Sequence, residues 1–242
     1  MTDVALVTGG TGGIGRAICA RLSGAGYAVL AGDVGVDEAP EAVSPAAAGE
    51  VLDYPMDVRS DESVEAAVDA AAHLGRLTGV VNCAGVLREA RAEVMPQREA
   101  DAMWAVNVMG AGRVTRAALP HLGAGAAVVN ISSIVGAIGR FAGTAMYSAS
   151  KAGLEGLTRV LACELAGRQI RVNAVAPGYI RVPMAPSWAS MSGGEQVLIG
   201  QVPLGRLGEV DEVADVVEFL LSDRSSYVTG SVIRVDGGVW AW

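Results

Sequence analysis

Charged residues are scarce in this chain, and aromatic residues are scarcer still. Only 18% of the 242 residues are charged and 5% are aromatic, whereas 51% are hydrophobic. The core must therefore be aliphatic, as in a parallel sheet that helices cover on both faces. The net charge of −8 and the lack of a basic cluster argue against nucleic acid and anionic membrane surfaces as partners.

Cysteine and histidine are also rare. Three cysteines, Cys19, Cys83 and Cys163, fall on segments that we expect to be buried, and their odd number fits reduced thiols in a cytoplasm. His73 and His121 are too isolated for a metal site, so we expect no bound metal. The first strand begins almost at once, so we also expect no signal peptide.

Residues 117–139 carry no charge, which raises the question of a membrane span. Pro120, Asn130 and several glycines divide this stretch into a helix end, a turn and a strand. We therefore expect no span and no membrane partner.

Short apolar runs alternate with segments of helical periodicity along the whole chain. The expected strands are residues 3–8, 27–32, 50–54, 78–82, 126–132, 170–175 and 231–235. The expected helices include residues 14–24, 62–73, 98–119, 146–166 and 210–221. This alternation predicts a single α/β domain over residues 1–242, with a doubly wound parallel sheet and a ligand site beyond the carboxyl ends of the strands.

A glycine-rich loop, Thr8 to Gly15, joins the first strand to the first helix. Glycines let a backbone approach a pyrophosphate, and a helix N-terminus supplies N–H groups and a positive dipole. Two patterns fit the loop: Gly10, Gly12 and Gly15 match G-x-G-x-x-G, and Gly9, Gly13 and Gly15 match T-G-x-x-x-G-x-G. A tight turn without a ligand is the alternative.

Asp33 ends the second expected strand, about 20 positions beyond the glycines. A carboxylate in that place accepts hydrogen bonds from both hydroxyls of an adenosine ribose and repels a 2′-phosphate, so it predicts NAD as the cofactor. A solvated loop carboxylate is the alternative.

Tyr147 and Lys151 lie one turn apart on one face of an expected helix. A free tyrosine has a pKa near ~10, and a nearby ammonium group lowers that pKa by favouring the phenolate. The two residues can therefore form a general acid/base unit. An ordinary surface pair on a helix is the alternative.

The order and spacing of these motifs resemble the short-chain dehydrogenase/reductase family over nearly the whole chain. Further matches are Asp57-Val58, Asn82-Cys83-Ala84-Gly85, Asn107, Ser133, residues 173–178 and the Asp-Gly-Gly of residues 236–238. The resemblance implies the strand order 3-2-1-4-5-6-7 in a single-domain Rossmann-like fold. It also implies catalysis by four residues: Asn107, Ser133, Tyr147 and Lys151.

The resemblance further implies a set of cofactor contacts along one edge of the sheet. These are Gly9, Thr11, Gly12, Gly13, Ile14, Gly15, Asp33, Asp57, Val58, Asn82, Ala84, Gly85, Tyr147, Lys151, Pro177, Gly178, Ile180 and Val182. Asn107 is expected to hold a water that links Lys151 to solvent.

Three positions depart from the family pattern. Ser133 and Tyr147 are one position further apart than is usual, which indicates one inserted residue between them; Ser132 is the alternative serine. Val182 replaces a threonine that often holds the nicotinamide amide. Cys83 replaces an asparagine.

Residues 181–200 are expected to form a substrate lid, because prolines and glycines break this insertion into short pieces. Its Met184, Trp188 and Met191 are expected to face Val135, Phe141, Met146 and Tyr179 across an apolar substrate pocket. Packing in the core or at a subunit contact is the alternative.

These features predict a cytoplasmic, NAD-dependent oxidoreductase that interconverts a secondary alcohol and a ketone. The substrate is expected to be apolar or cyclic, because no basic cluster lies in the lid. One alternative is a 3-oxoacyl-thioester reductase of the same family. The other is a non-catalytic dinucleotide sensor. The long, small-residue-rich helices and the apolar C-terminus predict a homotetramer.

Overall fold

Seven parallel strands form the central sheet of the computed structural model, which describes residues 1–40, 43–139, 141–182 and 194–241. The strands are β1 Asp3–Thr8, β2 Ala28–Asp33, β3 Val51–Pro55, β4 Arg76–Asn82, β5 Ala127–Ile131, β6 Arg171–Pro177 and β9 Val232–Val235. Their spatial order is β3-β2-β1-β4-β5-β6-β9. The expected order is confirmed, with β9 as the seventh strand of the sheet.

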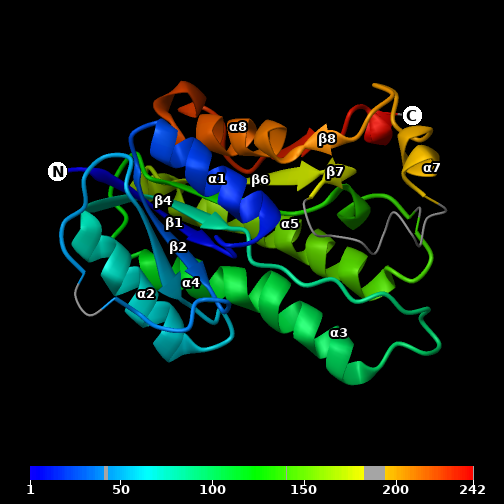
Figure 1. Cartoon of the computed structure of the whole chain (residues 1–242), viewed down its shortest axis with the longest axis horizontal. Helices are drawn as coiled ribbons and strands as arrows, with labels where there is room; N and C mark the ends of the chain where they lie inside the picture. Colours follow the sequence, from blue (N-terminus) through cyan, green and yellow to red (C-terminus); the bar gives the residue numbers. More distant parts are fainter. Residues whose placement is uncertain (41–42, 140, 183–193, 242) are drawn as a thin grey trace.

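Helices cover both faces of this sheet (Figure 1). The α-helices are α1 Gly13–Gly24, α2 Asp61–Leu74, α3 Gln97–Trp104, α4 Ala111–Ala118, α5 Ala145–Leu165, α7 Glu195–Ile199 and α8 Val210–Leu221. α1 and α8 pack against each other on one face, while α2, α4 and α5 cover the other. The fold is therefore the predicted single-domain, Rossmann-like α/β arrangement.

The two faces of the sheet bury separate aliphatic clusters, as a doubly covered sheet requires. Ile18 and Val213 belong to the cluster beneath α1 and α8. Val64, Val114 and Leu165 belong to the cluster beneath α2, α4 and α5. The sheet is thus fixed from both sides, and its strand ends form a firm platform for a site.

One helix differs from the sequence prediction. The single helix expected over residues 98–119 contains α3, then a π-helical segment η1 Ala105–Gly110, then α4. A π-helical turn inserts an extra residue into the hydrogen-bond ladder, and such turns are frequent at functional sites. The candidate catalytic residue Asn107 lies in this segment.

The chain between β6 and α8 contains short elements that the sequence did not predict. β7 Ile180–Arg181 pairs in parallel with β8 Gly208–Glu209, and α7 follows the part of the expected lid that lies outside the described residues. In Figure 1 these elements gather at the end of the molecule opposite the N-terminus. The 3₁₀ segments are η2 Ile134–Gly136, η3 Ala166–Arg168, η4 Asp223–Ser225 and η5 Val239–Ala241.

The sequence predicts that all three cysteines are buried, and the structure agrees only in part. Cys19 is buried and Cys83 is half-buried, but Cys163 is exposed because it lies on the outer face of α5. In the part of the chain that the structure describes, no helix combines the length and apolar character needed to cross a membrane.

Candidate active site

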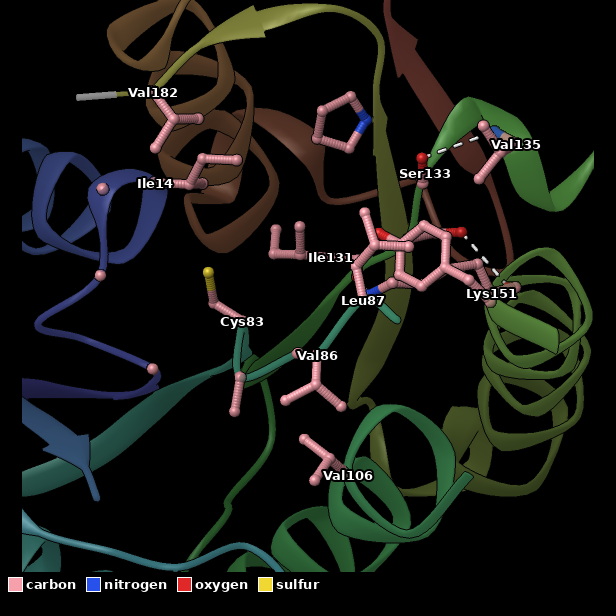
Figure 2. A pocket seen from close by; sticks show the side chains of 18 of the residues that line it. Ile14, Cys83, Val86, Leu87, Val106, Ile131, Ser133, Val135, Lys151 and Val182 are labelled. Atoms are coloured by element: carbon pink, nitrogen blue, oxygen red, sulfur yellow. Dashed lines mark hydrogen bonds between the residues drawn. The ribbon is translucent and has the colours of Figure 1, made fainter. Parts of the chain in front are cut away.

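A cavity of about 1510 Å³ opens beyond the carboxyl ends of β1, β4, β5 and β6. It lies where the strand order reverses between β1 and β4, the place where doubly wound sheets bind their ligands. Many of the expected site residues line it: Gly9, Gly12, Gly13, Ile14, Gly15, Asp33, Asp57, Val58, Ala84, Gly85, Ser133, Val135, Phe141, Tyr147, Lys151, Pro177, Gly178, Ile180 and Val182. Figure 2 shows Ile14 and Val182 on the wall next to α1, facing Ser133 and Lys151 across the cavity.

Packing requires glycine at several positions of the loop, Gly9 and Gly15 among them. Gly9 has a φ of +66°, and a Cβ there would lie 2.9 Å from the Cα and N of Ala84. A Cβ on Gly15 would lie 2.0 Å from the carbonyl oxygen of Gly9. Such contacts are too short for any side chain, so these glycines hold the loop flat against the sheet edge.

Helix α1 begins at the cavity wall without a side-chain cap on its first turn. The first N–H groups of a helix have no partner within that helix, and they carry the positive end of its dipole. Gly13 and Ile14 are the first two residues of α1 and line the cavity. The loop and helix end therefore fit the pyrophosphate of a dinucleotide.

Asp33 ends β2 at the same wall. Its Oδ2 accepts a hydrogen bond from the Thr11 amide at 3.2 Å, and its Oδ1 accepts one from the Gly35 amide at 3.2 Å. These bonds orient the carboxylate and leave each oxygen able to accept another donor. Thr11 thus acts on the site through Asp33, although it does not line the cavity itself.

Asp57 lines the cavity, but its carboxylate is already engaged by Arg59. The Arg59 Nη2 lies 2.7 Å from Oδ2, while the Arg59 Nε and backbone N–H both donate to Oδ1 at 2.9 Å. The guanidinium holds the pKa of this carboxyl below its usual range. Asp57 and Val58 both line the cavity, and their contact with an adenine stays a prediction.

Ser133, Tyr147 and Lys151 meet on the far wall of the cavity. The Ser133 side chain lies near the Tyr147 hydroxyl and acts to lower its pKa, and the Ser133 Oγ accepts from the Val135 amide at 3.4 Å. The Lys151 ammonium lies 5.7 Å from the centre of the Tyr147 ring and donates to the Ile131 carbonyl at 2.8 Å. Figure 2 shows Ser133 and Lys151 turned toward this part of the cavity.

Burial has the largest effect on the pKa values of Tyr147 and Lys151. Burial raises the pKa of Tyr147 to about 12, against the opposing effect of the Ser133 hydrogen bond. Burial also lowers the pKa of Lys151 to about 8. The expectation that Lys151 by itself lowers the Tyr147 pKa is therefore not met in this geometry, because its ammonium group is tied to the Ile131 carbonyl.

The neighbouring serine has a different environment. Ser132 Oγ donates to Glu155 Oε1 at 2.9 Å and to the Lys151 carbonyl at 3.3 Å. Its hydroxyl is thus used to join the end of β5 to α5. Of the two serines, only Ser133 acts on the pKa of Tyr147, which favours it as the catalytic serine.

Asn107 lies beside Lys151 but does not line the cavity. Its Oδ1 accepts from the Val86 amide at 2.8 Å, and its Nδ2 donates to the Val86 carbonyl at 2.9 Å and to Ser150 Oγ at 3.0 Å. A Cβ on Gly85 would lie 3.3 Å from Lys151 Nζ, so glycine there lets the ammonium group approach. Asn107 therefore ties the β4 loop to α5, and its role in holding a water stays a prediction.

Three other expected residues also lie away from this cavity. Asn82 is buried beneath it and donates to Asn130 Oδ1 and Thr115 Oγ1. Met146 lines a separate cavity of about 150 Å³. Tyr179 is buried in a small apolar cluster next to the site.

The remaining expected lid residues, Met184, Trp188 and Met191, lie outside the described residues. Sequence reasoning missed several other residues of the wall: Val86, Leu87, Ala102, Val106, Thr144 and Gln201. They belong to the loop after β4, to α3 and η1, to the start of α5 and to the turn after α7, and no motif marks them.

Comparisons with known proteins agree with this geometry. Residues 9–240 match the family model described as "Enoyl-(Acyl carrier protein) reductase". The 3-oxoacyl-[acyl-carrier-protein] reductase FabG of Thermotoga maritima is 39% identical over 98% of this chain and 97% of its own length.

Two solved structures share the fold. A short-chain dehydrogenase/reductase from Serratia marcescens superposes with a TM-score of 0.86, at 31% identity, over 98% of this chain and 97% of that one. A putative 2-deoxy-D-gluconate 3-dehydrogenase from Agrobacterium tumefaciens with bound NADP has a TM-score of 0.85 at 28% identity, over 99% and 97%. Matched over nearly its full length by sequence and by fold, the chain belongs to the short-chain dehydrogenase/reductase family of oxidoreductases.

Proposed function

We propose that this protein transfers a hydride between NAD(H) and a secondary alcohol or ketone, with an apolar or cyclic substrate. One observation carries the proposal: Ser133, Tyr147 and the Lys151 ammonium lie together on the wall of the same cavity that the glycine loop lines. The walls around the pair are largely aliphatic, which suits an apolar substrate.

The chain's own residues would move the proton while a bound NAD supplies the hydride chemistry. In the oxidation direction Tyr147 takes the hydroxyl proton of the alcohol, and in the reduction direction it returns one to the ketone oxygen. Ser133 donates to the same oxygen and stabilises charge that develops on it.

The pKa of Tyr147 must fall for it to act as a base near neutral pH. The Ser133 hydrogen bond already acts in that direction. Lys151 would add to it if its ammonium group turned from the Ile131 carbonyl toward the phenol.

Asp33 supports NAD rather than NADP. Its carboxylate is held at the end of β2 by two backbone amides and would repel a 2′-phosphate. We expect kcat/KM to favour NAD over NADP by at least ~100-fold, which corresponds to about 2.7 kcal/mol. Steady-state kinetics with both cofactors and one alcohol tests this, and similar efficiencies would overturn the role of Asp33.

Reduction of 3-oxoacyl thioesters is the second candidate. The name of the Thermotoga maritima relative favours it, and the NADP in the Agrobacterium tumefaciens structure shows that the phosphorylated cofactor suits this fold. Against it stand Asp33 and the absence of a basic side chain at Gly12, where a 2′-phosphate would need a cation.

A substrate panel separates the candidates. Oxidation of secondary alcohols with NAD and reduction of acetoacetyl-CoA with NADH or NADPH are both followed at the nicotinamide absorbance. Efficient turnover of the thioester with NADPH, but not of simple alcohols with NAD, would favour the second candidate. Any NAD-linked turnover would exclude a non-catalytic sensor.

We place the reaction in the reducing cytoplasm, since the three cysteines are free.

A further inference from the structure

The substrate half of the cavity has few polar side chains. Apart from the expected cofactor contacts, the side chains that line the cavity are mostly apolar, such as Val86, Leu87, Val106, Val135 and Phe141. Apart from Ser132, Ser133, Tyr147 and Lys151 at the candidate catalytic site, the polar side chains described on this part of the wall are Arg88, Glu89, Thr144 and Gln201. Recognition of any polar group on the substrate must use one of these four.

Two of the four already have partners within the protein. The Arg88 Nε donates to Glu99 at 3.1 Å, so its charge is balanced. The Thr144 hydroxyl donates to the Phe141 carbonyl at 2.8 Å and shares a bond with Ser148 at 3.2 Å. Glu89 carries a negative charge and repels anionic groups. Apart from the Lys151 ammonium beside Tyr147, which donates to the Ile131 carbonyl, no cation without a partner is left among the described side chains of this wall for a carboxylate or phosphate.

Gln201 is different, because one side of its amide is fixed and the other is not. The hydroxyl of Tyr179 donates to Gln201 Oε1 at 2.8 Å. Tyr179 is itself fixed, since it is 3% exposed and its ring meets Phe141 edge-to-face at 5.8 Å and 85°. The amide of Gln201 is therefore held in one orientation from beneath the wall.

The Gln201 Nε2 has no hydrogen-bond partner among the described residues, and it is not sealed away from solvent. Gln201 lines the cavity, so this nitrogen has two N–H donors available there. An uncharged donor on an apolar wall strongly favours a ligand that carries an oxygen at that place, because few other groups on the wall compete for that oxygen.

Resting on the proposed function, we propose that Gln201 is a specificity-determining residue that donates from Nε2 to a second, uncharged acceptor oxygen of the substrate. The favoured substrates are ketones, and the matching alcohols, that carry a carbonyl or ester oxygen near the reacting carbon. Anionic substrates are disfavoured by Glu89 and by the lack of an unpaired cation.

The test compares two ketones of equal chain length, ethyl acetoacetate and 2-heptanone, which differ by the ester group. Gln201→Met keeps the length of the side chain but removes the donor. With NADH, this variant should lose about 10-fold in kcat/KM for ethyl acetoacetate, the scale of one hydrogen bond of about 1.4 kcal/mol. It should change less than about 3-fold for 2-heptanone, where no such bond is formed.

Two further variants separate the donor from the packing. Gln201→Glu keeps an acceptor for the Tyr179 hydroxyl but replaces the NH₂ group by an oxygen, so it should lose at least as much for the oxo ester as the Met variant. Tyr179→Phe keeps the ring against Phe141 but releases the amide, so a smaller loss for the oxo ester alone is expected. Thermal melts report whether each variant is folded.

Equal losses for both ketones in Gln201→Met, or an unchanged oxo-ester rate in Gln201→Glu, would overturn the role of Gln201 while leaving the proposed function intact. An unmodified enzyme that turns over neither ketone with NADH, yet melts cooperatively, would overturn the proposed function and this inference with it.

Discussion

Tyr147 and Lys151 lie on successive turns of α5, and burial moves their pKa values in opposite directions, to about 12 and about 8. A buried phenol keeps its proton, and a buried amine gives its proton up more easily, because both environments disfavour charge. At the scale of single residues, catalysis therefore depends on what the remaining polar groups do to the phenol. Ser133 is the side chain that acts to lower its pKa.

Tyr147→Phe removes the hydroxyl that exchanges the proton and keeps the ring packing. Turnover should fall by ~100-fold or more, the usual scale for losing a general acid/base. Binding of NAD, measured by fluorescence titration, should change little. Near-normal turnover would show that another group carries the proton.

Serine variants provide the matched comparison for that result. Ser133→Ala should impair turnover strongly, because Ser133 is the serine whose side chain acts to lower the pKa of Tyr147. Ser132→Ala should cost stability more than turnover, because Ser132 Oγ donates to Glu155 and to the Lys151 carbonyl. The reverse pattern would mean that the extra residue between serine and tyrosine was assigned to the wrong place.

Lys151 makes stability depend on pH. Its pKa is lowered from 10.5 to about 8 on folding, so between these values the unfolded chain binds more protons and the free energy of unfolding rises with pH. Below pH 8 the charged lysine costs the folded state up to roughly 3 kcal/mol relative to high pH.

Lys151→Met removes the titrating amine, so the variant lacks this pH-dependent contribution to stability. The stability of the variant minus that of the wild type should therefore be largest near pH 7 and should shrink as the pH rises from 8 toward 10.5. Thermal or urea unfolding of both proteins across this range measures the difference. A difference that stays constant with pH would contradict the burial of a charged Lys151.

At the scale of elements, periodicity predicted every strand of the main sheet to within a few residues, because buried parallel strands are continuous apolar runs such as Val4 to Val7. It did not predict η1, since one extra residue in a helix turn leaves the apolar pattern nearly intact. It also could not predict β7 and β8, which have two residues each.

The residues of the candidate site were likewise predicted only in part from the sequence. Glycine and acidic motifs marked the cofactor end, because that chemistry constrains the backbone. Gln201 and Val106 carry no motif and reach the wall only through tertiary packing.

η1 meets the expected cofactor site through Gly110. A Cβ added there would lie 2.8 Å from Val58 Cγ2 and 3.0 Å from Val58 Cβ, so Gly110→Ala must push Val58 toward the cavity that it lines. We expect the KM for NAD to rise by roughly 10-fold, equivalent to about 1.4 kcal/mol, with a smaller change in kcat.

Gly112→Ala is the matched control, two positions along the same helical run. Its Cβ would lie in ordinary contact, 3.8 Å from Leu157 Cδ2. Replacing a helical glycine without a clash should leave the KM unchanged and stabilise the fold by about 0.5–1 kcal/mol. Similar kinetic effects in both variants would show that Val58 does not transmit the change.

At the scale of the whole molecule, the C-terminal segment packs against its own chain. Val239 is 1% exposed and joins the cluster that contains Tyr179. The Arg234 guanidinium lies 4.0 Å from the centre of the Trp240 ring, while Trp240 stays 41% exposed. Trp242 lies outside the described residues. Truncation of the chain after Gly238 would therefore remove core packing as well as any subunit contact made by the C-terminal segment. Trp240→Ala is the cleaner test of whether this segment contributes to a subunit contact.

A different surface gives the stronger argument for assembly. Trp104, Met109 and Val160 are 37%, 58% and 56% exposed on the adjoining elements α3, η1 and α5. Exposed apolar side chains on packed helices mark a surface that a partner covers. Gly156 on α5 also leaves room for a neighbouring helix, because a Cβ there would meet only Arg159 Nη2 at 3.9 Å, whereas Gly153 packs against Trp104 of the same chain.

We therefore expect a homotetramer with two-fold axes, in which this helix surface meets its copy. A two-fold contact presents each residue twice, so one charge placed in it is opposed by the same charge from the other subunit. Met109→Arg combined with Val160→Arg should give a smaller species by light scattering coupled to size exclusion. Tyr227→Arg, at a fully exposed position on another surface, is the control and should leave the mass unchanged. A monomeric mass for the unmodified chain would contradict the tetramer. A tetramer that survives the double substitution would show that its interfaces lie elsewhere.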